Sequence, residues 1–221
     1  MDGAHDFPAG HRGFEAECAA LLGIIEGLPP ADFGRVTNCR PWTLHELLVH
    51  IADSLRMPDP AVPVAPATLA RGDAADYYRR PERGTVAYRS GNVDQTRRSA
   101  RTVQPAEVAT LFTEAWKQTS RICAAHDPDR RMEAVDAYLL TRLMSVAAHG
   151  IDVAITLSKP AWTTPRTLRA LRPVLADLLG QAPPEAWTDQ DLLEIGTGRR
   201  PLTPADHDGL GPLAARFPLL S

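Results

Sequence analysis

Two histidines, His50 and His149, lie in amphipathic stretches that carry further polar residues at helical spacing. Imidazole is the commonest metal ligand and the usual general acid or base near neutral pH. A lone histidine beside an apolar face is usually a core or boundary residue. Two of them on facing helices can share one site, because bundle interiors place metal and cofactor ligands in this way. We therefore expect His50 and His149 to mark the functional centre.

The stretch from Tyr138 to Leu157 is apolar except for a few residues, most of which lie on one face. The polar residues spaced by 3, 4, 3 and 4 positions are Arg142, Ser145, His149, Asp152 and Thr156. At helical periodicity they form one stripe about 80° wide. A solvated face is the simpler interpretation, but the stretch contains no Lys or Glu and is apolar on its other sides. We predict a buried helix whose polar stripe must find partners.

A second helix is predicted to supply those partners. Thr43 and Glu46 have the spacing of a capping box, and a leucine stripe follows them. Glu46, His50 and Asp53 share the flank of that stripe. Two imidazoles with a third ligand are typical of zinc or another borderline divalent metal, whereas histidine beside aspartate also suits acid–base chemistry without metal. Ser145 and His149 share a helix turn, which leaves a nucleophilic role for the serine open.

Helical periodicity organises the rest of the chain. Strong helix patterns cover residues 8–28, 43–57, 105–127, 136–157 and 164–180, and Thr203 begins a further helix signal. Residues 191–197 are predicted to form a short strand. We expect an all-α four-helix bundle over residues 1–160 and a C-terminal helical cap over residues 161–221, with α+β character if that strand forms.

A long connection, residues 58–103, separates the second and third helices of the bundle. It is predicted to contain short helices near residues 68–78 and 92–101, and it carries eight arginines against five acidic residues. Arginine binds carboxylates through two parallel hydrogen bonds. Arg80, Arg83 and Arg142 are therefore our candidates for holding a cofactor or substrate, although a solvated loop would explain any single arginine of the connection.

The bulk composition excludes several classes of function. With 221 residues and a formal net charge of −3, the chain lacks the basic field of a nucleic-acid or anionic-membrane binder. No apolar run approaches the roughly 20 residues of a membrane span, and the N-terminus has no secretory signal pattern. Three scattered cysteines fit a reducing cytoplasm and argue against a disulfide framework or a cysteine zinc site. We expect a cytoplasmic monomer or homodimer that binds a small molecule.

Three motifs resemble one known family. Residues 41–52, PWTLHELLVHIA, resemble the W-T-hydrophobic-x-[DE]-L-hydrophobic-x-H-L-A motif of the mycothiol-dependent maleylpyruvate isomerases, a family of the DinB-like superfamily. Residues 145–154, SVAAHGIDVA, are similar to its E-x-x-x-H-G-x-D-hydrophobic-A motif apart from the first residue. Residues 196–203, GTGRRPLT, are similar to a T-G-R-x-P-L-[ST] stretch near the end of such proteins.

The resemblance implies a DinB-like bundle that binds a divalent metal through His, Glu and His, and that uses mycothiol, a low-molecular-weight thiol of actinobacteria. By position the ligands are His50 and His149, but Ser145 replaces the glutamate. A neutral hydroxyl is a poor zinc ligand. Asp53 could replace the carboxylate, a substrate or thiol could complete the site, or the site could be metal-free with both histidines as acid, base or polar anchors.

The function that follows is that of a small-molecule enzyme. We expect a thiol-dependent isomerase or S-transferase that acts on a thiol or its conjugate, with His50, His149, Ser145 and Asp53 as the catalytic candidates. The alternatives are a metal-free biosynthetic enzyme that uses the two histidines as acid and base, and a non-catalytic binding or regulatory module with a decayed metal site.

Overall fold

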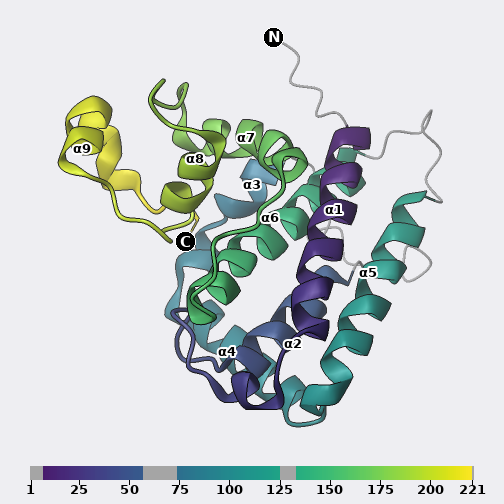
Figure 1. The fold of residues 1–221 in the computed structure, drawn as a ribbon. Helices are drawn as coiled ribbons and strands as arrows, with labels where there is room; N and C mark the ends of the chain where they lie inside the picture. The colour runs from purple at the N-terminus through teal and green to yellow at the C-terminus, as the bar shows by residue number, and fades with distance from the viewer. Residues whose placement is uncertain (1–6, 57–73, 125–132, 221) are drawn as a thin grey trace.

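The computed structural model describes residues 7–56, 74–124 and 133–220, and these are almost entirely helical (Figure 1). The α-helices of this part of the chain are α1 (Phe7–Glu26), α2 (Leu44–Leu55), α3 (Ala74–Tyr78), α4 (Val86–Ala100), α5 (Val108–Ala124), α6 (Glu133–Thr156), α7 (Pro165–Leu179), α8 (Asp189–Gly196) and α9 (Pro204–Leu210). No strand occurs among the described residues. The all-α prediction is confirmed.

The bundle consists of α1, α2, α5 and α6, which pack against one another around one apolar core. Helix α6 contacts both α1 and α2, and its core side chains include Leu139, Leu143 and Met144, each no more than 1% exposed. This helix is long and apolar enough to cross a membrane over Val135–Thr156, but 72% of its most apolar window is buried inside the protein. It is therefore the central helix of a bundle, as its sequence pattern indicates.

The beginning of α2 is fixed by the capping box that the sequence predicts. The hydroxyl of Thr43 accepts a hydrogen bond from the Glu46 backbone N–H, and the Glu46 carboxylate accepts one from the Thr43 backbone N–H at 2.8 Å. These bonds satisfy two N–H groups that a helix end leaves without partners. The cap sets the register of α2, so that its leucines are buried and His50 and Asp53 lie on the flank.

The connection between α2 and α5 contributes α3, a 3-10 turn over Pro81–Gly84, and α4, which packs against α2. Two short helices were predicted here, and residues 74–78 and 92–100 fall inside α3 and α4. Part of the first predicted helix lies outside the described residues. Helix α4 begins six residues earlier than predicted because Thr85 caps it, its hydroxyl accepting from the Tyr88 backbone N–H at 3.1 Å.

The C-terminal segment adds α7, α8 and α9. Helix α7 packs on α1 and α6 and ends at Gly180, which has the positive φ of 82° that a left-handed helix cap favours. The strand predicted over residues 191–197 is wrong, because residues 191–196 belong to α8 and Thr197 is its C-cap. A capping box between Thr188 and Asp191 begins that helix, and its aspartate replaces the usual glutamate. The division into a bundle and a cap at residue 160 stays a prediction.

Shortening a core side chain of α6 should destabilise the fold far more than shortening an exposed one. Leu143 is fully buried, so we expect Leu143→Ala to lower the free energy of unfolding by about 2 to 5 kcal/mol. Ile155 on the same helix is 46% exposed, so Ile155→Ala should change it by less than about 1 kcal/mol. Urea denaturation measures both. Equal losses would mean that Leu143 is not a core residue.

Candidate functional site

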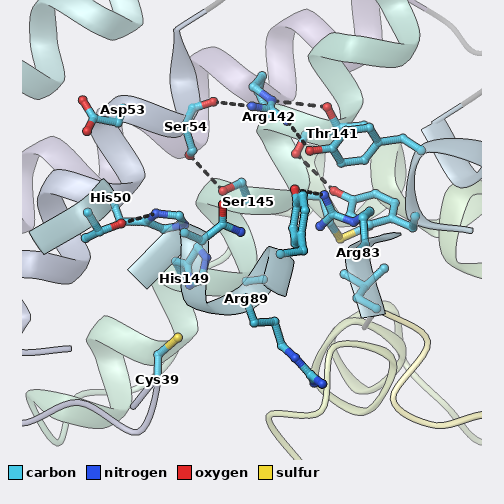
Figure 2. A pocket seen from close by; sticks show the side chains of 18 of the residues that line it. Cys39, His50, Asp53, Ser54, Arg83, Arg89, Thr141, Arg142, Ser145 and His149 are labelled. Carbon is cyan, nitrogen blue, oxygen red and sulfur yellow. Dashed lines mark hydrogen bonds between the residues drawn. The ribbon is translucent and has the colours of Figure 1, made fainter. Parts of the chain in front are cut away.

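A cavity of about 460 Å³ lies between α2, α4 and α6. The loop before α2 contributes Cys39 and Trp42 to its wall, and the connection contributes Tyr77 and Arg83. The C-terminal segment reaches the cavity through Arg199 and Leu220. Figure 2 shows that polar side chains converge here from several elements.

The structure brings His50 of α2 and His149 of α6 together at this cavity. Their ring centroids are 5.2 Å apart, and the rings are almost perpendicular at 86°. The buried indole of Trp42 packs against the His50 ring, with 4.4 Å between the centroids. Both rings are thus positioned by packing before any ligand enters.

His50 is held as a neutral imidazole. Its Nδ1 is 3.1 Å from the Thr96 hydroxyl, which α4 supplies. Burial, and to a smaller extent the nearby charges of His149 and Arg142, together lower the pKa of His50 to about 3. His50 can therefore donate or accept a hydrogen bond in the cavity, but it does not carry a positive charge near neutral pH.

His149 has a different environment, because it is bonded to Asp152 one turn further along α6. Its Nδ1 lies 2.9 Å from Oδ2 of that carboxylate. Burial alone would raise the pKa of Asp152, but hydrogen bonds from His149 and Arg199 hold it at about 2. An ionised carboxylate only accepts hydrogen bonds, so Nδ1 of His149 carries the proton and Nε2 has a free lone pair when the ring is neutral.

Asp152 is itself held by two long-range partners. Arg199 donates from Nε at 3.1 Å and from Nη2 at 2.6 Å, which is a bidentate contact, and the Asn38 side chain donates at 2.8 Å. With His149, these donors use both carboxylate oxygens fully. The network joins α6 to the loop before α2 and to the segment after α8. It fixes the carboxylate and therefore the imidazole that it orients.

Ser145 lies at the cavity and bonds to Ser54 of α2 rather than to a histidine. The two hydroxyl oxygens are 3.0 Å apart (Figure 2), and Ser54 gives its own proton to the Ile51 carbonyl at 2.8 Å. Ser145 must then be the donor. Among the described residues no hydrogen bond joins Ser145 to His149, so the geometry does not support a serine nucleophile activated by that histidine.

The arginine candidates separate into two groups. Arg83 and Arg142 line the cavity. Arg80 does not: it lies over the Tyr77 ring but faces a different groove, formed with α7 and the C-terminal segment. The role of Arg80 in holding a cofactor stays a prediction, and the residue is not among those that line this cavity. A 3-10 turn begins at Pro81, between the two arginines: Arg83 lines the cavity and Arg80 lines the other groove. The sequence pattern did not predict this difference.

The residues present do not fit a divalent metal. Serine stands at position 145, where a glutamate would be the third ligand. Asp53 lines the cavity, but it belongs to no cluster of potential ligands among the described residues. Within the part of the chain that the structure describes, the one such cluster consists of Cys39, His149 and Asp152. Burial and the charge of Asp152 raise the pKa of Cys39 to about 11, so a metal that binds there must displace the thiol proton, which weakens its affinity. The Asp152 oxygens are already used by Arg199, which a cation would have to displace.

Three residues of the site were not identified from the sequence: Arg199, Asn38 and Thr96. Arg199 lies in residues 196–203, which resemble a T-G-R-x-P-L-[ST] stretch of the family, but the resemblance assigns no function to this arginine. A buried carboxylate such as Asp152 needs a hydrogen-bond donor, and a distant arginine is a suitable one. The residue spacing did not indicate which arginine that would be. Asn38 and Thr96 carried no such signal.

Comparison with known proteins gives one finding. Residues 14–154 match the family described as the mycothiol maleylpyruvate isomerase N-terminal domain. This range includes α2, α4 and α6, and therefore both histidines, but not Arg199. Searches of curated proteins and of solved structures give no match.

The lowered pKa of His50 should appear as a loss of stability in acid. An unfolded histidine takes up a proton near pH 6.5, whereas folded His50 stays neutral down to about pH 3. The unfolded chain therefore binds more protons in this window, so stability is lost as the pH falls through it, by up to about 1.4 kcal/mol per pH unit. His50→Gln should reduce this slope in urea denaturation between about pH 7 and pH 4.5. The exposed His207 is the control, and an equal reduction in His207→Gln would contradict the assignment.

Restoring a carboxylate at residue 145 should create metal affinity. The Ser145→Glu variant adds a negative charge beside two imidazoles, so we expect it to bind Zn²⁺ or Ni²⁺ at least about tenfold more tightly than the unmodified protein. Ser145→Gln has the same length without the charge and should not. Calorimetric titration of untagged protein measures this, and equal affinities in all three proteins would show that residue 145 does not face a metal position.

Proposed function

Because the chain belongs to the mycothiol maleylpyruvate isomerase N-terminal domain family, we propose that it is an enzyme in which His149 acts as the general base on a small molecule. The observation that carries the proposal is the His149–Asp152 pair at the cavity wall. A base of this kind needs a free ring nitrogen, a fixed tautomer and a counter-charge for the protonated ring. In His149, Nε2 is the free ring nitrogen, and the Nδ1–H bond to Asp152 fixes the tautomer. The Asp152 carboxylate is the counter-charge.

The group from which His149 takes a proton is the thiol of a low-molecular-weight cofactor. The family name supports mycothiol, and removal of the thiol proton is the step that creates the nucleophile. Nε2 of His149 accepts this proton, and Asp152 stabilises the resulting imidazolium. The thiolate sulfur then bonds to an electrophilic carbon of a carbon–carbon double bond conjugated to a carbonyl, and the π electrons of that bond move onto the carbonyl oxygen. In an isomerisation the resulting single bond rotates, the electron pair returns to re-form the double bond, the C–S bond breaks, and the released thiolate takes its proton back from His149, so that atoms and charge balance over the cycle.

The remaining residues support this step without taking part in it. Arg199 and Asn38 hold Asp152 in place. Neutral His50, packed on Trp42, offers a hydrogen bond to the reacting molecule without competing for the proton. Cys39 keeps its proton because its pKa is about 11, so the protein's own thiol does not act as the nucleophile.

A second candidate is acid–base chemistry without a thiol, because the His149–Asp152 pair would serve equally to remove a proton from carbon. The two candidates differ in one measurable property. The first requires that a thiol bind in the cavity and react faster there than in solution. The second predicts no effect of the thiol.

The test measures how fast mycothiol reacts with a small electrophile in the presence of the protein, in a Cys39→Ser background that removes the thiol of the cavity wall. We expect His149→Gln to lower the protein-dependent rate by at least about 100-fold, since general base catalysis typically contributes this much. Asp152→Asn should also lower it, and His207→Gln should not. A chelator should have no effect.

Two results would contradict the proposal. Equal rates with and without the unmodified protein would overturn the thiol step and favour the thiol-free candidate. Acceleration that survives His149→Gln would show that another group is the base. Circular dichroism of each variant confirms that a loss of rate is not a loss of fold.

A further inference from the structure

Arg142 is a positive charge in the cavity wall without a carboxylate partner. Its Nη1 donates to the Ser54 carbonyl at 2.7 Å, and its Nη2 donates to the Tyr77 hydroxyl at 3.2 Å (Figure 2). Among the described residues no acid forms an ion pair with it. Burial would lower the pKa of Arg142, but the hydroxyls of Tyr138, Tyr77 and Tyr78 raise it, so the charge persists. A partly buried charge without a counter-ion is costly, so an anionic ligand would stabilise it.

Arg83 brings a second guanidinium to the same ring. Its Cζ lies 4.4 Å from the centroid of Tyr77, and the Cζ of Arg142 lies 5.7 Å from that centroid. Arg83 donates from Nη1 to the Tyr88 hydroxyl at 2.9 Å, but its buried Nε has no partner. Arginine binds an oxyanion bidentately through its Nε and Nη2 edge, and no described residue accepts a hydrogen bond from that edge of Arg83. Because Nε is buried, the side chain must turn toward the cavity to present this edge.

The neighbouring groups indicate excess positive charge at this end of the cavity. Burial would raise the pKa of Tyr77, but Arg142 and Arg83 lower it below its usual value. The charged residues that line the cavity are Asp53, Arg83, Arg89, Arg142 and Arg199. Of the arginines, Arg199 is neutralised by Asp152. The imbalance disfavours a metal cation and favours an anion.

We propose that Arg83 and Arg142 form a subsite for an oxyanion of the substrate, either a carboxylate or a phosphate or sulfate group. This inference rests on the proposed function, because it describes the substrate of that enzyme. Arg83 provides the bidentate edge, and Arg142 provides the fixed charge. Arg142 and His149 are seven residues apart on α6, which is about 10 Å along the helix. The substrate is then an elongated molecule with an anion at one end and its reacting group at the other.

The subsite is tested by calorimetric titration of the full chain, at low salt, with succinate, inorganic phosphate and sulfate in turn. We expect saturable binding of at least one of these, and the strongest of the three identifies the oxyanion. Arg83→Gln should weaken that binding by at least about tenfold. Arg142→Gln should weaken it to the same extent. If that variant does not fold, Arg142→Lys is measured instead; it keeps the charge and should retain part of the affinity.

Matched controls separate the subsite from the general field of the protein. Arg98 is exposed on α4 and does not line the cavity, so Arg98→Gln should leave anion affinity within about twofold. His149→Gln should also leave it within about twofold, because His149 acts at the other end. If no anion binds saturably, or if Arg98→Gln weakens binding as much as Arg83→Gln, the subsite is overturned. Anion binding that survives while the thiol reaction proves independent of His149 would overturn the proposed function and leave the subsite standing.

Discussion

The site depends on one carboxylate. Asp152 is 1% exposed, and it accepts hydrogen bonds from an imidazole on its own helix, an arginine beyond α8 and an asparagine before α2. These three donors together offset the cost of burying this charge. The same bonds that orient His149 therefore also join the C-terminal segment to the bundle. The position of the segment after α8 and the orientation of His149 are therefore coupled through Asp152.

The charged residues of α6 differ from those of the motif that its sequence resembles. The motif that residues 145–154 resemble begins with a carboxylate where this chain has Ser145, and one turn earlier stands Arg142, whose guanidinium forms no ion pair among the described residues. A helix that would offer a negative charge to a cation instead presents a positive one. Ser54 connects both positions, since its hydroxyl accepts from Ser145 and its carbonyl accepts from Arg142. Ser145, which departs from the motif, and Arg142 are therefore held by the same residue of α2.

Much of the fold could be predicted from the sequence because its signals are local. The capping box at Thr43 and the helical spacing of the α6 stripe depend only on residues a few positions apart. Prediction failed where a local signal was atypical, as at α8, where aspartate completes the capping box. It also failed where partners are distant in sequence: Arg199 is 47 residues from Asp152, and the sequence pattern did not specify that pairing. The facing histidines could be inferred, but their separate environments could not.

Helix α6 carries the proposed base, the arginine of the proposed anion subsite and the centre of the core, and this has an evolutionary consequence. A substitution on α6 that alters chemistry also disturbs packing, so the reaction type should diverge slowly among descendants of this chain. The connection is under no such constraint, because Arg83 and Tyr88 reach the cavity from a segment with few core residues. New substrates can therefore be acquired by mutating the connection while the bundle is inherited unchanged.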